Sequence, residues 1–69
     1  MTSQATYTVQ GMTCGHCVSA VTEEVTRISG VHRVEVDLAT GTVVVTSERP
    51  LTDDEVRGAI TEAGYQLAG

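Results

Sequence analysis

Residues 33–45 read RVEVDLATGTVVV, which is an alternating run and a valine run joined by a glycine turn. Charged residues separate the apolar side chains of the first run, which are Val34, Val36 and Leu38. Such alternation is typical of a strand with one buried face. Gly41 can adopt the positive φ of a tight turn, and Val43 and Val45 continue the pattern beyond it. The stretch therefore predicts an antiparallel hairpin.

An amphipathic helix is predicted before the hairpin. From Gly15 onward the apolar residues recur at spacings of three and four, as on one face of a helix, at Cys17, Ala20, Val21, Val25 and Ile28. Gly30 is placed to end this helix, because glycine readily takes the left-handed conformation that follows a helix C-terminus.

A second helix is predicted after the hairpin. Thr52 is the expected N-cap, and Glu55 is its capping-box partner. Leu51 and Val56 are placed to pack together across the first turn. The buried stripe of this helix is expected at Val56, Ala59, Ile60 and Ala63, with Gly64 at its end.

Short runs at 6–10 and 65–68 add a strand at each end of the chain. The order is then strand, helix, strand, strand, helix, strand. Right-handed crossovers of the two βαβ units place both helices on one face of the sheet. We therefore predict an α+β fold, a ferredoxin-like βαββαβ sandwich with a four-stranded antiparallel sheet. The 69 residues fit a single domain, residues 1–69.

The charge balance narrows the classes of partner. Nine carboxylates face four arginines and no lysine, which gives a net charge of −5. Such a surface repels nucleic acid and anionic lipids. The polar N-terminal stretch does not resemble a signal peptide, and no run reaches the roughly 18 apolar residues of a membrane span. We therefore expect a cytoplasmic protein that does not insert into a membrane.

The two cysteines, Cys14 and Cys17, stand where the first strand gives way to the first helix. The positive end of the helix dipole and the unpaired N–H groups of a first turn favour thiolate over thiol. Two soft thiolates suit a soft ion of low coordination number, and Cu(I) fits that description best among biological metals. The pair therefore predicts a Cu(I) site.

Zinc requires more ligands than this pair offers. A structural zinc site has four, and the remaining candidates are His16, between the cysteines, and His32. The first helix is expected to separate His32 from the cysteines by about 20 Å. A closed zinc site within the chain is therefore not expected.

The stretch Gly11-Met12-Thr13-Cys14-Gly15-His16-Cys17 resembles the Gly-Met-x-Cys-x-x-Cys signature of heavy-metal-associated domains, which include bacterial copper chaperones. The resemblance extends to chain length, to the order of elements and to Ala63-Gly64-Tyr65. It implies a cytosolic Cu(I) chaperone rather than an enzyme. Such a protein transfers copper by thiolate exchange to the metal-binding domain of a copper-transporting P-type ATPase or to a copper-responsive regulator.

The same resemblance implies that Cys14 and Cys17 bind Cu(I) near-linearly and stay exposed to an incoming partner. It implies that Met12 points into the core and that Tyr65 lies beside the site, neither of them a ligand. Thr13 favours copper, because zinc-type relatives often carry a carboxylate before the first cysteine. Two molecules with such open sites could also share copper as a homodimer.

Other interpretations remain open at this point. His16 is a third ligand, a residue that tunes the thiolates, or a solvated loop residue. The chain could be the N-terminal metal-binding domain of a copper ATPase, or a mercury carrier. Cys-Gly-His-Cys is also the active-site sequence of thiol-disulfide oxidoreductases. Those enzymes resemble longer thioredoxin-like domains with a Trp before the motif and a cis-proline facing it, whereas this chain has no Trp and only Pro50.

Overall fold

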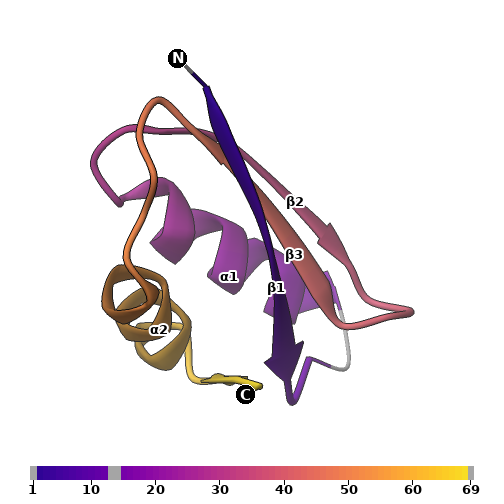
Figure 1. Ribbon diagram of the computed structural model, residues 1–69. Helices are drawn as coiled ribbons and strands as arrows, with labels where there is room; N and C mark the ends of the chain where they lie inside the picture. The colour runs from indigo at the N-terminus through magenta and orange to yellow at the C-terminus, as the bar shows by residue number, and fades with distance from the viewer. Residues whose placement is uncertain (1, 13–14, 69) are drawn as a thin grey trace.

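The predicted hairpin is present in the structure, a computed structural model that describes residues 2–12 and 15–68 (Figure 1). Its strands are β2 (Val31–Asp37) and β3 (Thr42–Ser47), which pair in antiparallel register. Val34 and Val36 lie opposite Val45 and Val43, so these four valines share one face, whereas Val44 lies opposite Glu35 on the other face. Gly41 takes a φ of +71° in the connecting turn, as predicted.

One residue of the hairpin departs from the prediction. Leu38 lies in the turn rather than in β2, and 39% of its surface is exposed. The Asp37 carboxylate accepts a hydrogen bond from the Ala39 N–H at 2.9 Å, and the Asp37 carbonyl accepts one from the Gly41 N–H at 2.9 Å. These local hydrogen bonds start the turn one residue before the alternating pattern ends.

Two further strands complete an antiparallel sheet in the order β2-β3-β1-β4. β1 (Ser3–Gln10) begins earlier than predicted and pairs with β3 over most of its length. β4 (Gln66–Leu67) is shorter than predicted and pairs only with Val9 and Gln10. The helices α1 (Gly15–Thr26) and α2 (Asp53–Glu62) cover the same face of the sheet (Figure 1). The ferredoxin-like prediction is confirmed.

α1 ends before the glycine that was expected to stop it. Its last residue is Thr26, and the chain then turns toward Gly30. Gly30 has a φ of +91°, and a Cβ atom there would lie 3.2 Å from Cγ of Glu48. Glycine is therefore required by the connection into β2 rather than by the helix end. Among the described residues, no helix is long and apolar enough to cross a membrane.

The start of α2 is held by its own neighbours in sequence. The Glu55 N–H donates to the Thr52 hydroxyl at 3.2 Å, and the Thr52 N–H donates to the Glu55 carboxylate at 3.0 Å, which is the predicted capping box. Arg49 donates to both oxygens of that carboxylate, at 2.7 and 3.1 Å. The Arg49 hydrogen bonds, followed by that of the Thr52 N–H, hold the pKa of Glu55 at about 2, well below its usual range.

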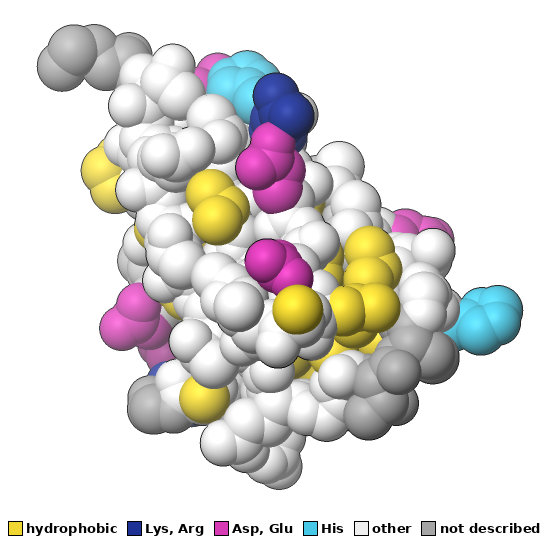
Figure 2. All heavy atoms as spheres, turned by 90° about the vertical axis from the view of Figure 1, so that its right-hand side faces the viewer, with side chains coloured by type: hydrophobic (Ala, Val, Ile, Leu, Met, Phe, Trp, Pro, Cys, Tyr) yellow, Lys and Arg dark blue, Asp and Glu magenta, His cyan; other side chains and the backbone are white. Residues whose placement is uncertain are grey.

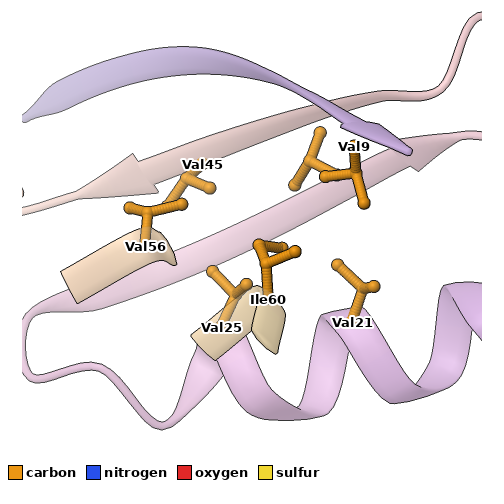
Figure 3. Packing of buried hydrophobic residues seen from close by; sticks show 7 residues of the cluster. Val9, Val21, Val25, Val45, Val56 and Ile60 are labelled. Atoms are coloured by element: carbon orange, nitrogen blue, oxygen red, sulfur yellow. The ribbon is translucent and has the colours of Figure 1, made fainter. Parts of the chain in front are cut away.

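The core between sheet and helices consists almost entirely of valine. Its buried side chains are Val9, Val43 and Val45 from the sheet, Val21 and Val25 from α1, and Val56 and Ile60 from α2. Figure 3 shows that side chains from the two helices and from the strands point toward one another. Each helix therefore buries the stripe that its spacing of three and four predicted.

At one end of the sandwich, three loops that are distant in the sequence meet. The Val9 N–H donates to the Gly41 carbonyl at 2.8 Å, which joins the end of β1 to the hairpin turn. The Ala68 N–H donates to the Thr8 carbonyl at 2.8 Å, which joins the segment after α2 to the same end of β1. The start of α1 lies at this end as well (Figure 1). The helix start that carries Cys17 thus lies at the same end of the fold as these loops.

Candidate metal centre

The connection from β1 to α1 leaves the sheet at Gly11, whose φ is +91°. A Cβ atom at this position would lie 3.4 Å from Cδ1 of Tyr65, so the backbone passes close to the Tyr65 ring. Met12 is partly buried and packs against the valine core, the position expected for it. Thr13 and Cys14, both predicted site residues, lie outside the described residues.

Cys17 is the third residue of α1, and only 4% of its surface is exposed. The resemblance led us to expect an exposed thiol, and for Cys17 this expectation is wrong. Cys17 precedes Val21 and Val25 by four and eight positions, so it lies on the face of α1 that turns toward the core. The helical period that predicts the core stripe thus also buries this sulfur.

Tyr65 contacts the cysteine directly. Its hydroxyl donates a hydrogen bond to Cys17 Sγ at 2.9 Å, between residues 48 positions apart. The resemblance placed Tyr65 beside the site, but nothing in the local sequence indicated this hydrogen bond.

The end of α2 positions the Tyr65 ring. Gly64 follows the helix with a φ of +95°, and the Tyr65 N–H donates to the Ile60 carbonyl at 3.1 Å. This hydrogen bond spans the end of the helix as in a Schellman motif, where a left-handed glycine turns the next residue back over the last turn. Gly64, Tyr65 and Gly11 also line an open depression of about 490 Å³ beside the site.

The histidines are far apart and differ in their surroundings. His16 is the second residue of α1 and is exposed, next to Gly15, which is exposed as well. His32 is exposed on β2, with Nε2 3.8 Å from a carboxylate oxygen of Glu48. The two cyan side chains of Figure 2 stand well apart. Within residues 2–12 and 15–68, no three His, Cys, Asp or Glu residues are grouped closely enough to hold a metal ion.

The first turn of α1 carries no acidic side chain. Its N–H groups are the positive end of the helix dipole, and an anion placed there is stabilised. At this turn the Cys17 sulfur accepts a hydrogen bond from the Tyr65 hydroxyl. The arrangement can hold a thiolate and a cation that the thiolate binds.

Known proteins resemble this chain over most of its length. The model of the family described as heavy-metal-associated domain matches residues 6–66. A curated relative, the copper chaperone CopZ of Enterococcus hirae, is 44% identical over 61 residues, covering 87% of this chain and 88% of that protein. The solved structure of a CopZ metallochaperone is 36% identical with a TM-score of 0.88, covering 96% of this chain and all of the other.

Another similar solved structure is the N-terminal domain of ZntA in its apo form. It is 31% identical with a TM-score of 0.88, and the match covers 99% of this chain and 92% of that one. The shared fold has a ferredoxin-like sheet order, which contradicts the thioredoxin-like alternative.

Proposed function

We propose that this chain, which belongs to the heavy-metal-associated domain family, carries one Cu(I) ion between Cys14 and Cys17 and passes it to another protein. The proposed receivers are the Cys-x-x-Cys domain of a copper-transporting P-type ATPase and a copper-responsive regulator. The protein acts as a cytoplasmic carrier and not as an enzyme.

The observation that supports this proposal most is the setting of Cys17. Its sulfur lies in the first turn of α1, where no carboxylate competes for the N–H groups, and it accepts the Tyr65 hydrogen bond at 2.9 Å. These features stabilise a negatively charged sulfur, and soft thiolates are the ligands that Cu(I) prefers. The name of the Enterococcus hirae relative agrees with copper as the cargo.

Transfer follows from ligand exchange without a change of oxidation state. Cu(I) displaces one proton from each thiol as it binds, so the proton count at the site falls by one for each sulfur that becomes a ligand. A partner thiolate then bonds to copper, one Cys–copper bond breaks, and the released sulfur takes up a proton. A second such exchange completes the transfer, and no electron is moved.

Cys17 is the sulfur that we expect to leave last. It is buried and hydrogen-bonded by Tyr65, which limits the access of an incoming thiolate to its sulfur. The first exchange is therefore proposed at Cys14. His16 is exposed on the same turn, and we assign it no bond to copper.

The similarity to the N-terminal domain of ZntA favours one other function. A domain of this kind can form part of a longer protein and receive a metal ion instead of delivering one. The same two cysteines would then bind the cargo, and the direction of transfer would be reversed.

A competition titration of the reduced protein with Cu(I), Zn(II) and Hg(II) tests the proposal. We expect one Cu(I) per chain, bound more tightly than Zn(II), and an affinity that falls as the pH is lowered because protons compete for the thiols. Cys14→Ser and Cys17→Ser should each abolish stoichiometric binding. Tighter binding of Zn(II), or unchanged binding in either serine variant, would overturn the proposal.

The two histidines provide a matched control for the role of His16. His16→Ala and His32→Ala remove the same side chain from an exposed position near the site and from β2, respectively. Equal Cu(I) affinity for both variants agrees with a solvated His16. A weaker affinity for His16→Ala alone would make His16 a ligand or a thiolate partner.

A further inference from the structure

A groove lies beside the hairpin and the first turns of α1. It has a volume of about 600 Å³, and its larger apolar lining residues are Val18 from α1, Val36 from β2, Leu38 from the turn and Val44 from β3. Leu38 is the one large hydrophobic side chain among the described residues that is exposed. Figure 2 shows apolar side chains gathered on the face that carries the hairpin. We call these four residues and the space between them the hairpin groove.

The hairpin groove borders the metal centre. Val18 directly follows Cys17 in α1, so its backbone is part of the turn that holds the sulfur. The hairpin turn is joined to the end of β1 by the Val9 to Gly41 hydrogen bond of 2.8 Å. A protein that brings its own sulfurs to Cys17 must therefore cover or closely approach the groove.

The charges at the groove all have one sign. Glu35 and Asp37 are the two charged residues that line it. Arg33 pairs with Glu35 at 2.5 Å, whereas Asp37 has no basic partner among the described residues. Figure 2 shows an acidic side chain beside the gathered apolar ones and no basic side chain touching them. The net charge of −5 adds to this local field.

We propose that the hairpin groove is the docking surface for the protein that exchanges copper with this chain, and that this partner carries an apolar contact surrounded by Lys or Arg side chains. The inference rests on the proposed function, since it names the chemistry of the receiving protein. Leu38 is the central contact, and Asp37 steers the basic rim.

The same charges disfavour a second copy of this chain as the occupant. Two copies would bring Asp37 and a charge of −5 toward an identical surface, and like charges across an interface cost free energy. A small groove beside a transfer site is also suited to a short-lived complex, because transient complexes bury less than about 1,200 Å² of surface. Such a partner can arrive, exchange copper and leave.

Copper transfer between engineered copies tests the groove. The donor is the wild-type chain loaded with isotopically labelled Cu(I). The first acceptor is a metal-free copy with Ser19→Lys, Thr40→Lys and Gln66→Lys, three exposed positions at the metal end of the fold. The control acceptor carries Thr2→Lys, Thr26→Lys and Ser29→Lys, which are exposed and lie at or toward the other end. Both acceptors have a net charge of −2 against −5 for the donor, so ion exchange separates them from it.

We expect transfer to the first acceptor to be roughly tenfold faster than to the control at low salt, and the difference to shrink as salt is added. Leu38→Ser and Asp37→Asn in the donor should each reduce this preference. Asparagine can still accept the Ala39 hydrogen bond that holds the turn. Glu48→Gln, which removes one charge at the far end of β3, should leave the preference unchanged.

Each outcome bears on one proposal. Equal transfer rates to both acceptors, or a Leu38→Ser donor that keeps its preference, would overturn the groove as a docking surface. If every donor still binds Cu(I) stoichiometrically when the groove proposal fails, the proposed carrier function is retained. A wild-type donor that does not bind Cu(I) would instead overturn the carrier function on which the inference depends.

Discussion

The first turns of α1 and α2 occupy the same place in their βαβ units, but the side chains at their N-termini differ in charge. The third residue is Cys17 in α1 and Glu55 in α2. Glu55 reaches back to Thr52 and out to Arg49, all within six residues. Cys17 turns inward and is contacted by Tyr65, 48 residues away.

The difference shows how one fold provides both a stable helix start and a binding site. The first turn of α2 has three carboxylates and an N-cap, so its positive end is already neutralised by its own side chains. The first turn of α1 has no carboxylate. Its stabilising partner comes from a distant loop, and the turn is left able to accept a negatively charged sulfur and its metal.

Placing the third residue of each helix in the other helix should have the largest effect on the stability of the fold. Cys17→Glu places a carboxylate where 4% of the cysteine surface is exposed, so we expect a loss of about 3–5 kcal/mol, as for other uncompensated buried charges. Urea unfolding under reducing conditions measures it. Glu55→Cys, at a partly exposed position, should cost less. Equal losses for the two variants would show that burial does not distinguish the turns.

Removing the Tyr65 hydroxyl should affect metal binding more than folding. Tyr65→Phe deletes the donor to Cys17, and we expect the Cu(I) affinity to fall by about tenfold, as when other outer hydrogen-bond partners of metal ligands are removed. A competition titration gives the affinity. Tyr7→Phe deletes the other tyrosine hydroxyl of the chain, on β1, and should leave the affinity unchanged. A drop of the same size in both variants would contradict a specific role for Tyr65.

Deleting the N-cap of α2 should lower the stability of the fold without changing metal binding. Thr52→Ala removes the hydroxyl that accepts the Glu55 N–H, which costs about 1 kcal/mol at typical N-caps. Urea unfolding provides the free energy, and Thr61→Ala, an exposed position near the end of the same helix, is the control. Unchanged Cu(I) affinity in Thr52→Ala is also expected. A loss of affinity would show that the two helix starts are coupled.

Acid should remove the contribution of Glu55 gradually. The folded pKa of Glu55 is about 2 and its ordinary value is 4.5, so its stabilising effect is complete above pH 4.5 and is lost as the pH falls toward 2. The difference in stability between the wild type and Glu55→Gln should therefore be constant near neutral pH and shrink below pH 4.5. Urea midpoints across this range measure it. A difference that persists at pH 2 would mean that the ionised carboxylate is not its source.

Most of the architecture could be predicted because its signals are local. The alternation around Gly41 indicated the hairpin, and Thr52 with Glu55 indicated the start of α2. The boundaries were less accurate where a few hydrogen bonds decide them. β2 stops at Asp37 because the turn captures its carboxylate and carbonyl, which leaves Leu38 exposed in the groove.

The sequence by itself determined the order of the elements, the valine stripes and the presence of two cysteines at a strand-to-helix junction. Hydrophobic period and capping depend on residues within a few positions of one another, so they can be read along the chain. The helical period already placed Cys17 on the core face of its helix, and only the tertiary structure decided that the Tyr65 hydroxyl reaches its sulfur. The reason is physical, because a hydrogen bond between residues 48 positions apart exists only once α2 has packed on α1 and its glycine end has turned Tyr65 back toward the other helix.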